Sequence, residues 1–391
     1  MPTEARIRIL LCSSSMNGGG SERQLLYLLQ GLDRNRFEPL LYLFFKEGAL
    51  LESVPQDIPI FAFWSDRRKP FLQWPGRMHH QYIDHLSDVI RKQRIDLTYD
   101  RLFHMTLVSG PATRKNNCPR VSTIVSPPQF DLQRKEERWQ WVKRRRLARA
   151  YRESTALLSV SQGTAESAST FYNIPKEQFQ IVPSPLDISG IDRKRLEPLP
   201  EVPFDQNLRH ILSVGRLSAE KGHADLLDAF GLLVADHGTS YRLHLVGDGP
   251  LKSALMQQAD RLGITPYVHF HGHLNNPYPL MQRCDLLVLP SHYEGLPNVM
   301  LEAMVCRCPV LATDTQQGAG EFLRKHPFGR LVPGKNPKAM AAGIADRFNQ
   351  PTLWTSVLDD AEQYTRHHHG LSHWIESLSE LFEKIAKAPK S

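Results

Sequence analysis

The chain has 391 residues, more than one hydrophobic core usually supports, so two domains are expected. Its 41% hydrophobic and 23% charged residues are typical of a globular protein, and no apolar run reaches the length of a membrane span. Five cysteines without C-x-x-C pairs argue against a disulfide framework or structural zinc, while the net charge of +7 favours anionic partners such as nucleotides, phosphates or acidic lipids.

Short β-branched runs alternate with amphipathic stretches of helix length along the chain. The run IRILLC precedes SERQLLYLLQGL, HILSVG precedes HADLLDAFGLLVADHG, and RLHLVG precedes LKSALMQQADRLG. This alternation predicts the α/β class, with doubly wound parallel sheets covered by helices on both faces. The apolar run at the N-terminus is too short for the core of a signal peptide, so a cytoplasmic protein is expected.

The alternation stops at residues 183–208, where prolines and charges replace the periodic apolar pattern. We therefore expect a Rossmann-like domain over 1–185, a linker over 186–208 and a second Rossmann-like domain over 209–361. The tail, 362–391, predicts a final amphipathic helix that is able to pack back on either domain, the N-terminal one included. Each doubly wound sheet would offer a binding crevice at the carboxyl ends of its strands.

Residues 134–152 carry nine basic and two acidic side chains, together with Trp139 and Trp141. The pattern predicts a basic, partly amphipathic helix. Such a helix is either a solvated surface element or a docking element for anionic lipid headgroups. The second interpretation would place the protein peripherally on the inner face of a membrane.

The stretch NGGGSER, residues 17–23, follows the first predicted strand and opens a helix. Gly19 and Gly20 let backbone amides approach a ligand where the helix N-terminus favours negative charge, and a tight turn is the alternative. A dinucleotide site is disfavoured because G-x-G-x-x-G is absent and the second strand does not end in Asp or Glu.

Two basic residues follow a strand of the second predicted domain, Arg216 and Lys221 in SVGRLSAEKG. Arginine clamps phosphate and lysine adds a point charge, so the pair is able to neutralise a departing diphosphate; a solvated loop is the alternative. Gly247 of VGDGP would let a nucleotide lie close to the backbone. No D-x-D triplet occurs, and the consecutive histidines 367–369 cannot all face one ion, so no metal is expected.

The stretch SHYEGLPNVMLEAM places Glu294 and Glu302 eight positions apart around a Gly-Leu-Pro step. Pro297 suits the first position of a helix, so Glu294 would lie on the preceding loop and Glu302 inside the helix. Glycosidase carboxylates lie roughly 5–10 Å apart, whereas this spacing along a helix covers about 12 Å, so hydrolysis by the pair is disfavoured. The two carboxylates are better suited to accept hydrogen bonds from two parts of one long ligand, one from sugar hydroxyls and the other from ribose hydroxyls. A nucleotide sugar is such a ligand.

Together these motifs resemble the retaining glycosyltransferases of family 4, which have the two-domain GT-B fold. The resemblance covers nearly all of residues 6–350. It rests on four motifs in the right order: GGGSER, the basic pair Arg216 and Lys221, the E-x7-E pair Glu294 and Glu302, and CPVLATD at 308–314, which stands where the family has its next strand.

The resemblance implies a role for each of these residues. Arg216 and Lys221 would bind the diphosphate, and with Glu294, which would hold the transferred sugar, they form the expected catalytic set. Glu302 would bind the donor ribose. The remaining donor-binding positions would be Gly19 and Gly20 near the phosphate or acceptor, and Gly272 and His273 beside the base. Gly247, against the nucleotide, and the step Gly295, Leu296 and Pro297 complete the set.

The sequence also departs from the family pattern. Many members carry a histidine after the fourth strand of the first domain, where this chain has Val125 and Ser126 on the expected acceptor side. Ser184 and Pro185 stand where Asn-Gly is usual, and Arg307 replaces a frequent glycine after the E-x7-E helix. A positive φ at Arg307 would cost roughly 1 kcal/mol.

The resemblance thus implies a metal-independent, retaining hexosyltransferase that uses a UDP- or GDP-linked sugar and an acceptor hydroxyl on a glycan or lipid-linked molecule. Polysaccharide, lipopolysaccharide or glycolipid biosynthesis is the expected setting, and nucleic acid is not an expected partner. The alternatives are a nucleotide-sugar epimerase of the same architecture and a catalytically inactive relative that binds nucleotide sugars.

Overall fold

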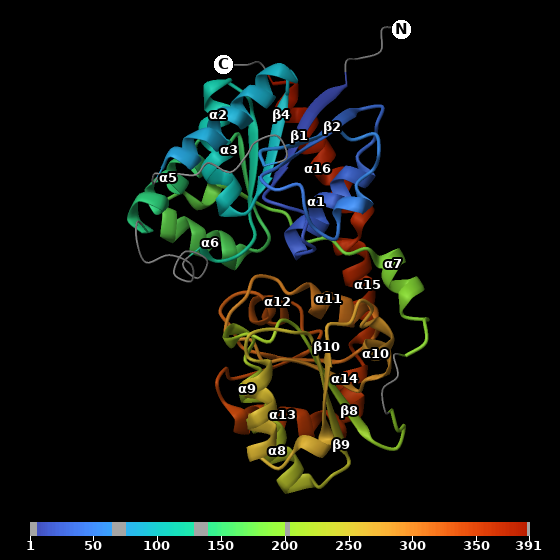
Figure 1. The fold of residues 1–391 in the computed structure, drawn as a ribbon. Coiled ribbons are helices and arrows are strands. Elements are labelled where there is room, and N and C mark those ends of the chain that lie inside the picture. The colour runs from blue at the N-terminus through green and yellow to red at the C-terminus, as the bar shows by residue number, and fades with distance from the viewer. Residues whose placement is uncertain (1–5, 65–75, 129–139, 200–203, 389–391) are drawn as a thin grey trace. The chain divides into compact units, whose positions relative to one another are not determined.

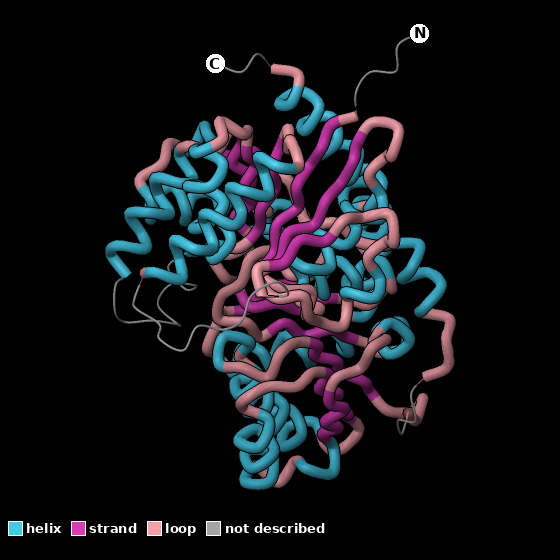
Figure 2. Tube along the Cα trace, turned by 45° about the horizontal axis from the view of Figure 1, so that its top comes forward, coloured by secondary structure: helices cyan, strands magenta, loops and turns pink. Residues whose placement is uncertain are grey.

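The computed structural model describes residues 6–64, 76–128, 140–199 and 204–388. Two compact units divide the chain: Met1–Ser184 together with Leu371–Ser391, and Pro185–Gly370. Each unit contains one sheet in which every pair of neighbouring strands is parallel (Figures 1 and 2). The predicted fold class, two doubly wound α/β domains, is confirmed.

The first unit is built on a seven-stranded sheet of order β3-β2-β1-β4-β5-β6-β7. The order reverses between β1 and β4, which marks a doubly wound sheet. Successive residues of β1 serve opposite faces, since Leu10 and Leu11 belong to different apolar clusters. The strands are β1 (Ile7–Ser13), β2 (Phe37–Leu43), β3 (Ile60–Ala62), β4 (Leu97–Arg101), β5 (Arg120–Ile124), β6 (Ala156–Ser159) and β7 (Phe179–Ile181).

Helices cover both faces of this sheet, with α1 and α16 on one side and α2 and α3 on the other (Figure 1). The final helix, α16, contributes Phe382, whose ring lies 5.5 Å from that of Tyr99 on β4. The helices of this unit are α1 (Gly20–Gly31), α2 (Arg77–Lys92), α3 (Phe103–Lys115), α5 (Gln140–Arg152), α6 (Gln162–Tyr172) and α16 (Leu371–Ala386).

The second unit has a six-stranded sheet of order β10-β9-β8-β11-β12-β13, which reverses between β8 and β11. Ile211 and Leu212, adjacent on β8, again belong to cores on opposite faces. The strands are β8 (Arg209–Val214), β9 (Tyr241–Val246), β10 (Val268–Gly272), β11 (Leu286–Leu289), β12 (Val310–Thr313) and β13 (Arg330–Val332).

The helices of the second unit form two layers. One layer packs α8 and α13 against the sheet, and the other includes α10, α11 and α12. The helices are α7 (Ile188–Lys194), α8 (His223–His237), α9 (Lys252–Arg261), α10 (Tyr278–Arg283), α11 (Asn298–Val305), α12 (Ala319–Lys325), α13 (Pro337–Asn349), α14 (Pro351–Thr355) and α15 (Leu358–His369).

The stretch 186–208, expected to be a linker, contains the short helix α7. Asp187 caps it by accepting a hydrogen bond from the Gly190 amide at 2.9 Å. Asp192 on α7 accepts two hydrogen bonds of 2.7 Å from the Arg366 guanidinium on α15. These contacts tie α7 into the second unit, which ends at Gly370. The final helix, α16, begins at Leu371, and residues 362–369 belong to α15 of the second unit.

Candidate active site

The loops that follow β8 and β11 meet at the carboxyl end of the second sheet. These two strands are neighbours, and the strand order reverses between them. In open parallel sheets ligands bind outside the carboxyl ends of the strands at such a reversal. The loop after β8 carries Arg216 and Lys221, and the loop after β11 carries Glu294.

Lys221 and Glu294 form an ion pair at this point, with Lys221 Nζ 2.6 Å from Glu294 Oε2. The backbones of the two loops are fastened together, since the His292 amide donates to the Glu220 carbonyl at 2.8 Å. Gly222 allows the close approach: its φ is +65°, and a Cβ there would lie 2.0 Å from the Pro290 carbonyl oxygen. The structure therefore brings together two of the three predicted catalytic side chains.

Glu294 keeps one carboxylate oxygen without a protein partner. Its side chain is 11% exposed, and the buried Oε1 has no hydrogen bond among the residues that the structure describes. A buried carboxylate oxygen without a donor is costly, and hydroxyl groups of a ligand would satisfy it. The geometry thus provides one oxygen for Lys221 and one for a bound molecule.

His292 and Asp225 make a second connection between the same elements. His292 Nε2 lies 2.8 Å from Asp225 Oδ2, which is in the first turn of α8. His292 lies two positions before Glu294, so this contact helps to fix the loop that carries the carboxylate. The sequence motifs do not indicate this pair, because its two members are 67 positions apart and the motifs assign no role to either.

The loop after β11 leads into α11, which begins at Asn298. Pro297 occupies the position before the helix, one earlier than expected. Glu302 lies inside α11 and is partly exposed, as predicted, whereas Glu294 lies on the loop. Gly318, with φ +68°, closes the site from the β12 side, since a Cβ there would lie 2.4 Å from the Gly295 carbonyl oxygen.

Three glycines bring the ends of β8, β9 and β10 into close backbone contact. The Gly247 amide donates to the Gly272 carbonyl at 2.7 Å, and a Cβ on Gly247 would lie 1.9 Å from the Gly215 carbonyl oxygen. Both Gly247 and Gly272 have positive φ. The following residue, His273, and the nearby Arg216 are exposed, and the Arg216 guanidinium makes no hydrogen bond or ion pair with the described part of the chain.

His223 is a buried histidine beside the basic loop. Burial, and secondarily the Lys221 charge, lowers the pKa of His223 to about 4. The imidazole is therefore neutral near neutral pH, and it adds no positive charge to the site.

Gly295 and Leu296 lie on the loop before α11, and the other predicted residues belong to the first unit. Gly19 is the residue before α1 and Gly20 is its first residue. Val125 and Ser126 follow β5 and line a small cavity of about 10 Å³ together with Leu102.

Comparisons with known proteins identify both halves of the chain. A domain model described as Glycosyltransferase Family 4 matches residues 18–189, and a model described as glycosyl transferases group 1 matches residues 197–368. The two matches follow one another and leave little of the chain uncovered.

A curated relative is the Campylobacter jejuni enzyme named N-acetylgalactosamine-N,N'-diacetylbacillosaminyl-diphospho-undecaprenol 4-alpha-N-acetylgalactosaminyltransferase. It is 32% identical over 194 residues, which are 50% of this chain and 51% of that enzyme. The match thus spans about half the length of that relative.

Solved structures match over nearly the whole chain. The Anabaena protein HepE in complex with UDP has a TM-score of 0.76 at 22% identity, covering 97% of this chain and 100% of that one. A glycosyltransferase from Rickettsia africae has a TM-score of 0.78 at 17% identity, covering 98% and 100%. At these identities the likeness establishes the GT-B fold.

Proposed function

The chain belongs to glycosyltransferase family 4, and from this premise we propose that it transfers a sugar from a nucleoside diphosphate donor to an acceptor hydroxyl with retention at the anomeric carbon. The donor is a UDP- or GDP-linked hexose-type sugar, and the acceptor is a glycan or a lipid-linked glycan. Support for the donor comes from HepE, solved with UDP, and support for the acceptor from the diphospho-undecaprenol named in the Campylobacter enzyme.

The proposed reaction breaks the bond between the anomeric carbon and the diphosphate oxygen and forms a bond to the acceptor oxygen on the same face. The acceptor proton passes to the departing diphosphate. Arg216, Lys221 and the N-terminus of α11 stabilise the charge that develops on the diphosphate, which is the main task in such a step. The protein supplies this positive charge itself, without a metal.

The other residues of the site hold the donor in place. Glu294 accepts hydrogen bonds from sugar hydroxyls through its unpartnered Oε1. Glu302 accepts from the ribose hydroxyls, and the glycine-lined ends of β8, β9 and β10 allow the nucleotide to lie against the backbone. Gly19 and Gly20 provide backbone amides on the first unit.

The observation that carries the proposal is the Lys221–Glu294 pair at the strand-order reversal, with one oxygen of Glu294 left for a ligand. A thermal-shift screen of nucleotide sugars tests it, because a ligand that binds only the folded state raises Tm. We expect one donor to raise Tm in the wild type and to have a much smaller effect on Glu302→Ala. The control Asp260→Asn, on an exposed position of α9, should respond like the wild type.

We also propose that α5 docks the protein to anionic membrane surfaces, at the cytoplasmic face. The described part of this segment carries six basic residues between 140 and 152, and Trp141 is 69% exposed. Residues 134–139, including Trp139, lie outside the described residues. Within the described ranges no helix combines the length and the apolar character needed to cross a membrane.

Liposome flotation tests this docking. Vesicles with anionic lipid should retain the protein at low salt and release it at high salt, because exposed charges are screened. Equal retention on neutral vesicles would refute an electrostatic attachment, and Trp141→Ser should weaken retention.

A further inference from the structure

Arg101 lies at the strand-order reversal of the first sheet. It is the last residue of β4, whose neighbours are β1 and β5. In register, Cys12 on β1 pairs with Asp100, and Arg101 pairs with Thr123 on β5. The loop that follows β1 leads to Gly19 and Gly20. Arg101 therefore occupies, at the end of β4 in the first unit, the topological position that the end of β11, before the Glu294 loop, occupies in the second.

The Arg101 side chain is buried but has few partners. The residue is 5% exposed, and its only hydrogen bond with the described chain is from Nη1 to the Tyr99 hydroxyl at 2.6 Å. Its Nε is buried without a partner. No carboxylate of the described residues forms an ion pair with it. A guanidinium has five N–H donors and stays charged at any physiological pH, so most of its capacity is unused.

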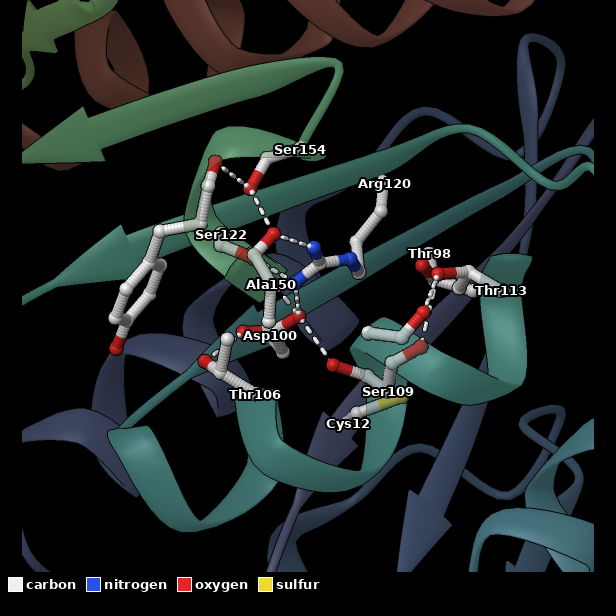
Figure 3. A network of polar contacts seen from close by, with 12 residues as sticks. Cys12, Thr98, Asp100, Thr106, Ser109, Thr113, Arg120, Ser122, Ala150 and Ser154 are labelled. Atoms are coloured by element: carbon white, nitrogen blue, oxygen red, sulfur yellow. Dashed lines mark hydrogen bonds and ion pairs between the residues drawn. The ribbon is translucent and has the colours of Figure 1, made fainter. Parts of the chain in front are cut away.

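Arg120, on the neighbouring strand β5, has the partners that Arg101 lacks. It is 2% exposed and lies 3.4 Å from the Asp100 carboxylate, and it donates to the Ser122 hydroxyl at 2.7 Å (Figure 3). Asp100 also accepts from Thr106 and Ser109 at 2.6 and 2.7 Å. Arg120 Nε, like Arg101 Nε, is buried without a partner, but Arg120 has a carboxylate beside it. Among the described residues Arg101, one strand away, has none.

The backbone beside Arg101 is strained. Leu102 has φ +72° and ψ +133°, outside the regions that residues with a side chain normally adopt. Such conformations persist where the surrounding structure holds them, and they concentrate at functional sites. Gln24 on α1, the helix that begins at this edge, is also buried and has an unpartnered Oε1.

We propose that Arg101 binds an oxyanion of the acceptor substrate, a phosphate, diphosphate or carboxylate group. Leaving a buried guanidinium without a counter-ion is costly, and planar bidentate oxyanions are its best partners. The inference rests on the proposed transfer reaction, and it assigns the oxyanion to the acceptor because the donor diphosphate already has Arg216 and Lys221. Arg101 pairs in register with Thr123, two positions before Val125.

Two matched variants, Arg101→Met and Arg120→Met, test whether the charge is uncompensated. In buffer without multivalent anions, Arg101→Met should have a Tm equal to or higher than that of the wild type, because a buried unpaired charge is removed. Arg120→Met should have a lower Tm, because Asp100 is left unpaired. A fall in Tm for Arg101→Met comparable to that for Arg120→Met would overturn the proposal.

Inorganic pyrophosphate is the probe for the site. In an Arg216→Met, Lys221→Met background, which removes the cations of the second unit, pyrophosphate should still raise Tm, and adding Arg101→Met should abolish the rise. An unchanged rise would contradict oxyanion binding at Arg101. Acetate in place of pyrophosphate distinguishes a carboxylate from a phosphate site.

Steady-state kinetics then assign the oxyanion to a substrate. Arg101→Met should lower kcat/KM for the acceptor about 10- to 100-fold, as expected for a lost charge-assisted hydrogen bond, with the donor KM unchanged. A rise in donor KM alone would refute the acceptor assignment. If the wild type transfers no sugar from any donor, the proposed function fails, but the two Tm experiments still decide whether Arg101 binds an oxyanion.

Discussion

Lys221 Nζ and Glu294 Oε2 lie 2.6 Å apart although the residues are separated by 73 positions. Their side chains are only 28% and 11% exposed. The two meet because β8 and β11 are neighbours whose following loops end at the same edge of the sheet. The pair holds a cation and a carboxylate ready before any donor arrives, which is the preorganisation that electrostatic catalysis needs.

Removing the cation should therefore reduce turnover. We expect Lys221→Met to lower kcat by about 100- to 1,000-fold, the loss typical of one electrostatic group. Steady-state release of nucleoside diphosphate measures it, with Lys325→Met, at the exposed end of α12, as the control. Wild-type turnover in Lys221→Met would exclude this lysine from catalysis.

The Asp225–His292 contact predicts a residue that acts through positioning. Asp225→Ala removes the partner of His292 and frees the loop before Glu294. Because small displacements of reacting groups cost up to about 100-fold, kcat should fall while the Kd of the donor changes little. The exposed Asp236→Ala on the same helix serves as the control. A rise in the Kd of the donor with an unchanged kcat would contradict a positioning role.

Arg307 has a left-handed backbone conformation, with φ +59°, which is expected where a residue replaces a frequent glycine of the family. It forms ion pairs with Asp359 and Glu362 on α15, and these exposed pairs contribute little. Arg307→Gly should therefore be more stable than Arg307→Ala by about 1 kcal/mol, the cost of left-handed backbone at a residue with a Cβ. Urea unfolding measures the difference, and equal midpoints would mean that the backbone is not strained.

His244 should make stability depend on pH. It is buried between His210 and His271, with ring nitrogens 2.9 and 3.0 Å from theirs, and burial followed by these neighbours lowers the pKa of His244 to about 2. The unfolded chain takes up a proton near pH 6.5 and the folded one does not, so stability is complete above that pH and falls below it.

Each such group contributes about 1.4 kcal/mol per pH unit to this slope well below pH 6.5. His244→Phe should remove one group's contribution when urea unfolding is compared at several acidic pH values. Parallel pH dependences for the variant and the wild type would show that His244 is protonated equally in both states.

Much of the fold was predictable because the chain alternates strand and helix signals clearly. The strands that precede Arg216 and Glu294 could be located from HILSVG and CDLLVLP. Because ligands bind at the carboxyl ends of such strands, the loops that follow them were expected to be functional. The start of α11 was predicted one position too early, at Pro297, because a proline is accepted both before a helix and in its first turn.

Other features depend on tertiary contacts that no local pattern records. The helix α7 is seven residues long, and it is held by the burial of Ile191 and by the Asp192–Arg366 ion pair, whose members are 174 positions apart. Arg101 ends a short strand, LTYDR, and its lack of a counter-ion becomes visible only when Asp100 is seen to serve Arg120 instead. The first depends on how two helices pack, and the second on the register of β4 and β5, which the sequence alone does not specify here.

The most direct test of the account is a transfer assay with each nucleotide sugar and a glycan or glycolipid extract, analysed for nucleoside diphosphate and for product mass. The account predicts that one donor releases nucleoside diphosphate in step with a product heavier by one sugar, and that Lys221→Met nearly abolishes both. Conversion of the donor to an epimer without release, or binding of a donor with no release in any extract, would contradict it.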